Sequence, residues 1–233
     1  MWLDEGKDNY AGVTYNNIQT SDNRRILIGW MSNWIYAGQV PTGNWRGVMT
    51  TPRELSLNLK EDGYRLSSKP IQELDSYFDK SMEFSPAISE TGVELKDNDI
   101  IKGGSYMLEF NVDFSKASTL NIKIGNKSEY LSIEYNSQNK KFFINRSHSG
   151  RVDFNGEFRN IISSSSTNYN GTVPVKILVD QSSLELFVND GETSMTTLFY
   201  PKYQYSNLSL YSSDSLSEIK DFTIVPILKS LNR

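Results

Sequence analysis

Short runs in which apolar and polar residues alternate, separated by turn-forming residues, occupy most of the chain after Met82. A period of two places successive side chains on opposite faces of a strand, so each run predicts a half-buried β-strand. Short strands at this spacing predict an all-β fold with an antiparallel β-sandwich. The runs are residues 100–114, 120–124, 130–135, 142–145, 173–179, 184–188, 196–200, 208–211 and 219–225.

A second constraint is the stretch from Arg25 to Leu59, which contains every tryptophan of the chain except Trp2. It predicts two strands joined by a connection that glycine and proline interrupt. Residues 1–15 predict a further strand, and the polar residues 16–24 predict a hairpin loop. Three or four strands cannot bury both of their faces. We therefore expect residues 1–59 to be part of something larger, with apolar edges that stay exposed unless another unit covers them.

We predict that the junction between these two parts lies at residues 70–78. Ile71, Leu74 and Phe78 have helical spacing, and proline is favoured at the first position of a helix. We expect a short helix here. The predicted units are residues 1–63, a linker over residues 64–80 that contains the helix, and a sandwich over residues 81–233.

Composition narrows the classes of function. The chain has no cysteine, which excludes disulfide bonds and thiolate metal sites. The only histidine, His148, has no second histidine for a metal site and is predicted to lie in a surface loop, so no metal or other cofactor is expected. The net charge is −4 with both signs interspersed, which does not indicate nucleic-acid binding. The sequence contains no run of about 18 apolar residues, so no membrane-spanning helix is predicted.

Several segments resemble glycoside hydrolase family 32, the invertases, levanases and inulinases. The first is I-G-W-M-S-N-W at residues 28–34, followed by P-R-E-L-S-L at residues 52–57. Upstream, D-E-G-K-D-N-Y-A at residues 4–11 is similar to the family segment D-x-G-x-D-F-Y-A, with Asn9 in place of phenylalanine. Downstream, S-S-L-E-L-F-V-N-D-G-E at residues 182–192 is similar to a strand pair near the C-terminus of the family.

The resemblance implies a fold and a reaction. The fold would be a remnant of the last blade of a five-bladed β-propeller, followed by a jelly-roll or concanavalin-like β-sandwich. The reaction would be hydrolysis of β-fructosidic bonds in sucrose, levan or inulin, among which the sequence does not choose. The full-length parent would be a secreted or periplasmic bacterial protein. Residues Met1 to Glu5 lack the features of a secretion signal. Because a fragment would not include the signal of its parent, the compartment is not predicted from this chain.

The catalytic motifs of that family are absent from this sequence. The family uses an aspartate in N-D-P-N-G as nucleophile, a second aspartate in R-D-P, and an acid/base glutamate in an E-C pair. The only near-match, Asn189-Asp190-Gly191, lacks the proline and is a preferred hairpin turn. No catalytic residue is therefore predicted. We expect the chain to be the C-terminal portion of such an enzyme, inactive alone, with the missing propeller as its partner and a homodimer also possible.

Three residues are predicted to bind substrate because they match family positions: Asp8, Tyr10 and Trp30. Aromatic rings stack on the C–H faces of sugars, but buried aromatic residues are equally common core material in strands, so both readings stay open. Asp8 could orient a sugar hydroxyl or could be a turn or strand-pairing carboxylate. Arg46 and the pair Arg53-Glu54 are expected to form ion pairs that close the blade. Asp180 and Glu185 could form a pair of carboxylates in a strand region, but we expect them to be exposed hairpin carboxylates.

A rival hypothesis makes the sandwich a free-standing carbohydrate-binding module, and another makes it purely structural. A binding module would use exposed aromatic side chains. The candidates are Tyr169, Tyr200, Tyr203, Tyr205 and Tyr211.

Overall fold

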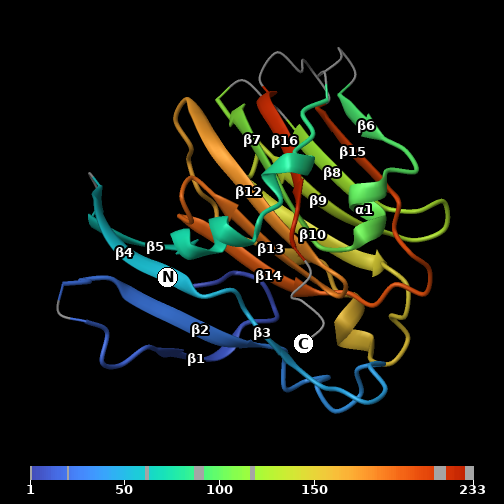
Figure 1. Ribbon diagram of the computed structural model, residues 1–233, viewed down its shortest axis with the longest axis horizontal. Helices are drawn as coiled ribbons and strands as arrows, with labels where there is room; N and C mark the ends of the chain where they lie inside the picture. The colour runs from blue at the N-terminus through green and yellow to red at the C-terminus, as the bar shows by residue number, and fades with distance from the viewer. Residues whose placement is uncertain are drawn as a thin grey trace.

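The computed structural model describes residues 2–19, 21–60, 63–86, 92–115, 119–212 and 219–228. In this part of the chain a two-sheet β-sandwich carries a smaller antiparallel sheet at its side (Figure 1). The small sheet comes from the N-terminal residues and the sandwich from the remainder. The predicted all-β fold is therefore confirmed.

The small sheet has the strand order β1-β2-β4-β5, and β3 pairs with β2. One long strand, RELSLNLK, alternates leucine with polar residues, and another, RILIGWM, is rich in isoleucine and tryptophan, features that favour a pleated, half-buried surface. Its strands are β1 (Tyr10–Thr14), β2 (Arg25–Met31), β3 (Val48–Met49), β4 (Arg53–Lys60) and β5 (Gly63–Pro70). Because β5 pairs with β4 along its whole length, this sheet extends to Pro70, and the first residues of the predicted linker form its last strand.

One sheet of the sandwich has the order β11-β10-β9-β8-β15-β6, and the other has the order β14-β13-β12-β7-β16. All strand pairs in the described parts of both sheets are antiparallel. The strands are β6 (Val93–Leu95), β7 (Tyr106–Asp113), β8 (Thr119–Gly125), β9 (Tyr130–Asn136), β10 (Lys141–His148), β11 (Ile162–Ser163), β12 (Thr172–Asp180), β13 (Ser183–Val188), β14 (Thr193–Leu198), β15 (Asn207–Ser212) and β16 (Ile219–Pro226).

The core lies between these two sheets. Alternate residues of each strand point inward, as Leu108, Phe110 and Val112 do in β7. Aromatic rings close one part of it, where Phe114 lies 4.4 Å from Tyr135 between ring centroids. Burial of this apolar surface supplies most of the stability of the sandwich.

The connections differ from the predictions in two places. The predicted junction helix is a 3₁₀ helix, η1 (Gln72–Tyr77), followed by η2 (Lys80–Met82). The predicted strand over residues 100–114 begins instead with a short helix, α1 (Asp99–Gly103). The Asn98 side chain accepts hydrogen bonds from the backbone N–H groups of Ile100 and Ile101, which is a helix N-cap. Gly104 ends the helix in the left-handed conformation, with φ 79°.

The predicted turn after β13 is confirmed. Asn189, Asp190 and Gly191 have φ values of 51°, 53° and 81°, which asparagine, aspartate and glycine tolerate better than other residues. A third 3₁₀ helix, η3 (Gly156–Arg159), follows β10. Within the described residues, no helix has both the length and the hydropathy required to cross a membrane.

Candidate functional site

The N-terminal residues run beside β14, the edge strand of the sandwich. The Glu5 N–H donates to the Ser194 carbonyl at 2.8 Å, and the Asp8 N–H donates to the Thr196 carbonyl at 3.3 Å. Gly6 lies so close that a Cβ placed on it would be 2.0 Å from the Thr196 carbonyl oxygen. The segment therefore covers an edge that would otherwise expose unpaired backbone groups.

Arg53, the first residue of β4, joins the small sheet to the sandwich. Its guanidinium donates to Asp4 Oδ2 at 2.7 Å and to Glu185 Oε2 at 2.5 Å. It also donates to the Thr196 hydroxyl at 2.6 Å and lies over the Phe187 ring. Arg53 has no exposed surface, and charges this deeply buried are tolerated only when they are paired and hydrogen-bonded.

A second buried arginine makes a similar connection from the opposite direction. Arg146 in β10 donates to Asp8 Oδ2 at 2.5 Å and to the Tyr36 hydroxyl at 2.8 Å. The Tyr36 hydroxyl in turn donates to Asp8 Oδ1 at 2.5 Å, and the Leu198 N–H donates to Asp8 Oδ2 at 2.9 Å. The Arg146 guanidinium also lies 3.8 Å from the Phe158 ring centroid. Every polar group of this network has a partner.

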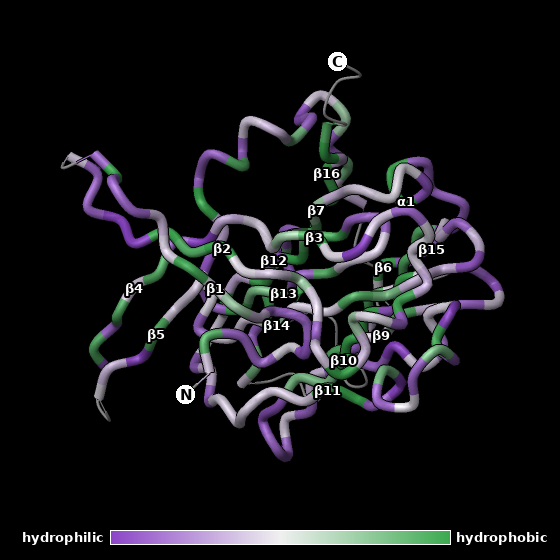
Figure 2. Tube along the Cα trace, turned by 90° about the horizontal axis from the view of Figure 1, so that it is seen from below, coloured by the Kyte–Doolittle hydropathy of each residue, from purple (hydrophilic) through white to green (hydrophobic). Residues whose placement is uncertain are grey.

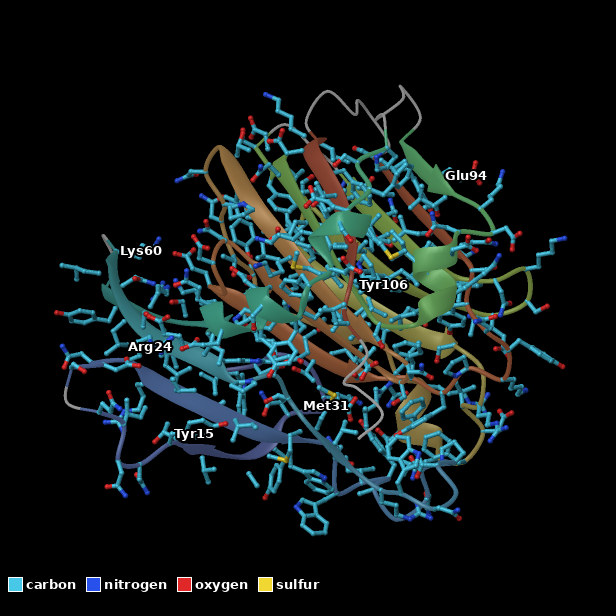
Figure 3. All side chains as sticks on the ribbon, viewed as in Figure 1. Tyr15, Arg24, Met31, Lys60, Glu94 and Tyr106 are labelled. Atoms are coloured by element: carbon cyan, nitrogen blue, oxygen red, sulfur yellow. The ribbon has the colours of Figure 1, made fainter. Side chains whose placement is uncertain are left out.

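An apolar cluster surrounds the Arg146 network. It joins residues after β2 to residues of the sandwich, and Figure 3 labels Met31 at this junction. The cluster consists of Met31, Tyr36, Val40, Val152, Phe158, Leu198 and Tyr200. The two parts of the chain are thus held together by buried ion pairs, backbone hydrogen bonds and a shared apolar core.

The pKa of Asp4 reflects its surroundings. Burial alone would raise the pKa of this carboxyl, but the charge of Arg53 and the hydrogen bonds from Thr196 and Arg53 outweigh it. The pKa of Asp4 therefore lies below its ordinary value of 3.8. The carboxylate is charged at neutral pH, as the ion pair with Arg53 requires.

An aromatic cluster lies on the small sheet beside these anchors. Tyr10 pairs with Trp30 across β1 and β2, and their ring centroids are 6.4 Å apart. Trp34 contacts both, at 6.3 Å from Tyr10 and 5.2 Å from Trp30. Trp34 is 70% exposed and Tyr10 is 52% exposed, whereas Trp30 is partly buried. Gly47 permits this packing, because a Cβ there would lie 2.4 Å from Trp30 Nε1.

The rest of the small sheet is also rich in exposed apolar side chains, as predicted for residues 1–59. The β4–β5 hairpin extends away from the sandwich (Figure 2). The exposed residues include Val13, Trp45, Met49, Leu57, Leu59 and Tyr64.

These features can be compared with known proteins. Residues 73–226 match the family "Glycosyl hydrolases family 32 C terminal", and residues 1–70 match "Glycosyl hydrolases family 32 N-terminal domain". The chain belongs to glycoside hydrolase family 32. The division between the two family 32 matches coincides with the end of the small sheet at Pro70.

Family 32 relatives are much longer than this chain. A levanase of Bacillus subtilis is 34% identical over 236 residues, which cover 98% of this chain and 34% of the levanase. An extracellular exo-inulinase of Aspergillus awamori is 31% identical, over 93% of this chain and 41% of that protein. The crystal structure of an exo-inulinase from Aspergillus awamori superposes with a TM-score of 0.82 at 27% identity, covering 98% of this chain and 44% of that chain. This family 32 chain spans less than half of these relatives and corresponds to their C-terminal portion.

Among the three residues that the sequence predicts to bind substrate, the structure places the rings of Tyr10 and Trp30 in contact and buries Asp8. Asp8 has no exposed surface, and both of its oxygens accept hydrogen bonds from protein groups. Arg146 and Tyr36 thus engage the Asp8 carboxylate inside the protein. Substrate contact by Asp8, Tyr10 and Trp30 stays a prediction.

Other predictions about side chains need correction. Glu185 is not an exposed hairpin carboxylate, because it pairs with Arg53 in the interior. Asp180 is exposed as expected. The Arg46 guanidinium donates to the Val40 carbonyl at 2.8 Å, and no ion pair of Arg46 or Glu54 occurs among the described residues. His148 is exposed, but it ends β10 and stacks on Tyr130.

The tyrosines proposed as exposed sugar-binding residues divide into two groups. Tyr169, Tyr200 and Tyr205 are buried, since each packs its ring into a cluster of other aromatic residues. Tyr203 and Tyr211 are exposed. In the part of this family 32 chain that the structure describes, no three histidine, aspartate or glutamate side chains gather in a way that could hold a metal ion.

The sequence interpretation missed two important residues. Trp34 completes the aromatic cluster, and its sequence signal was its position two residues before Tyr36 in a run already rich in aromatic residues. Arg146 carries the interface network, and it occupies the same face of β10 as Phe142 and Ile144. A charged residue in an apolar register was the signal that could have identified it.

Proposed function

We propose that this chain is the C-terminal portion of a β-fructosidase, an enzyme that hydrolyses β-fructosidic bonds in sucrose, levan or inulin. The observation that carries the proposal is the match of residues 1–70 and 73–226 to family 32, with a levanase and an exo-inulinase among the relatives. In this proposal the sandwich braces a propeller to which the small sheet contributes one blade.

The chain supplies no catalytic pair of carboxyl groups in this proposal. A retaining glycosidase needs two carboxyls about 5–5.5 Å apart that face the scissile bond. Asp4 and Asp8 precede Tyr10 in the sequence, but each carboxylate is buried and paired with an arginine, Asp4 with Arg53 and Asp8 with Arg146. The chain would contribute the aromatic surface of Tyr10, Trp30 and Trp34, on which the apolar face of a furanose could stack.

The proposal is tested by adding purified chain to sucrose, levan or inulin and measuring released fructose. We expect no release by the chain alone. Co-expression with the upstream part of a family 32 enzyme, ending where residue 1 aligns, should give a stable complex that releases fructose. The Trp34→Ala variant should raise KM in that complex. Fructose release by the chain alone would contradict the proposal.

A second candidate function is a carbohydrate-binding sandwich that acts without a propeller. The exposed ring of Tyr203 favours it, because binding modules present such rings to sugars. Binding by the isolated chain to sugars, without hydrolysis, is the measurement that supports it.

A further inference from the structure

The most exposed ring of the aromatic cluster lies on a compact turn. Trp34 is 70% exposed and belongs to residues 33–39, a segment that we name the Trp34 turn. Within it, the Tyr36 N–H donates to the Asn33 carbonyl at 3.1 Å, and the Gln39 N–H donates to the Tyr36 carbonyl at 2.8 Å. A ring this exposed is ordered by the backbone that carries it, so the position of Trp34 depends on what holds the turn.

A single side chain of the sandwich bridges the Trp34 turn. Asn155 precedes η3, in the connection from β10 to β11, and its Nδ2 donates to the Ile35 carbonyl at 3.3 Å and to Gln39 Oε1 at 2.7 Å. Its Oδ1 accepts a hydrogen bond from the Glu157 N–H at 2.9 Å, which caps η3. The cap requires the amide oxygen and the turn requires the amide nitrogen, so the partners of Asn155 fix the orientation of its amide. Asn155 therefore links the residue after Trp34 to the far end of the turn.

Two other anchors of the Trp34 turn do not involve Asn155. The Asn33 side chain donates to the Lys7 carbonyl at 2.9 Å. The Tyr36 side chain is 1% exposed, and its hydroxyl accepts a hydrogen bond from Arg146 at 2.8 Å. These contacts keep the turn attached to the protein, so loss of the exposed Asn155 hydrogen bonds should shift the turn rather than unfold the protein.

We propose that Asn155 is a positioning residue of the sandwich: it sets the position of the Trp34 ring and, through that ring, the saccharide affinity of the aromatic cluster. The inference rests on the proposed function, in which the cluster contacts a fructose-containing substrate. A ring displaced from its edge-on contacts with Trp30 and Tyr10 would no longer meet the sugar face that the other rings meet. In this arrangement the sandwich controls binding as well as bracing the propeller.

The position of the ring is tested in the purified chain by fluorine NMR after labelling with 5-fluorotryptophan. The chain has four tryptophans, and the Trp34 resonance is assigned by its loss in Trp34→Phe. The test variant is Asn155→Ser, because serine keeps a cap for η3 but has no amide to reach the turn. We expect the Trp34 resonance to move by more than its linewidth while the Trp2 resonance stays in place.

The matched control is Asn160→Ser in the same connection. The Asn160 side chain donates to Glu157 Oε2 at 2.8 Å, so this substitution removes an exposed hydrogen bond that does not involve the Trp34 turn. It should lower the thermal midpoint by a similar amount and leave the Trp34 resonance in place. Gln39→Ala removes one acceptor of Asn155 and should move the resonance in the same direction as Asn155→Ser. The double variant should move it by less than the sum of the two shifts.

The effect on affinity is measured in the complex with the upstream part of a family 32 enzyme. Asn155→Ser should raise KM for inulin about two- to tenfold, which is the range for one aromatic contact, and leave kcat unchanged. Asn160→Ser should leave both constants unchanged.

The outcomes separate this inference from the proposed function. A Trp34 resonance that stays in place in Asn155→Ser, or that moves as far in Asn160→Ser, refutes the positioning role. A moved resonance with an unchanged KM refutes the effect on affinity. A complex that releases no fructose, or whose KM does not change in Trp34→Ala, contradicts the proposed function, whereas the NMR comparison still decides the role of Asn155.

Discussion

Replacing Arg146 by methionine tests whether the buried ion network holds the small sheet to the sandwich. Methionine keeps an unbranched stem against the Phe158 ring but removes the guanidinium. Asp8 would then be a carboxylate without exposed surface that retains only the Tyr36 hydroxyl and the Leu198 N–H as partners. Breaking a buried ion pair by removing one partner costs about 3–5 kcal/mol.

That loss converts into a measurable shift of the thermal midpoint. For a protein of this size each kcal/mol lowers the midpoint by about 2–4 °C, so Arg146→Met should lower it by about 6–20 °C. Calorimetry at pH 7 measures this shift. The double variant Asp8→Asn with Arg146→Met should recover part of the loss, because it no longer leaves a buried charge unpaired.

The matched control is Arg24→Ala. Arg24 pairs with Asp22 at 2.7 Å and with Glu73 at 2.6 Å on the surface, where solvent screens the charges and such pairs contribute little to stability. If Arg146→Met costs no more than Arg24→Ala, or if the Asp8 and Arg146 substitutions add without any coupling, the reasoning is refuted.

Two further predictions concern the N-terminal segment. Because the pKa of Asp4 is lower in the folded state than its ordinary value of 3.8, its ion pair with Arg53 stabilises the fold at neutral pH. This stabilisation is lost as the pH falls from 3.8 through the lower pKa of the folded state. Urea unfolding from pH 7 to pH 2 should show that loss, and Asp4→Asn should show a flatter pH dependence; an equally steep dependence would refute it. Gly6→Ala should cost about 1–3 kcal/mol, because its Cβ would meet the Thr196 backbone. Gly38→Ala, which has open space around it, should cost less than half as much in the same urea titration, and equal losses would show that the segment can move aside.

Local sequence determined the elements whose cause is local. The alternation of Leu108, Phe110 and Val112 depends only on the two-residue period of a strand, so it could be recognised without any partner. The Asn189-Asp190-Gly191 turn was equally predictable, because its backbone angles suit those residue types. The helix α1 was missed although Asn98 and Gly104 mark its ends, since the same residues also extend an apolar run that leads into a strand.

Tertiary structure decided the roles of charged and aromatic side chains. Glu185 in isolation has the features of an exposed carboxylate of a hairpin, and its burial depends on Arg53 and Thr51, which are 132 and 134 residues away in the chain. Arg146 and Asp8 are 138 residues apart, and no local pattern couples them. Whether a tyrosine is exposed, as Tyr203 is, or buried, as Tyr205 is, depends on which strands fold over it. Backbone conformation follows from neighbours along the chain, whereas burial and charge pairing follow from neighbours in space, and that is the physical reason for the division.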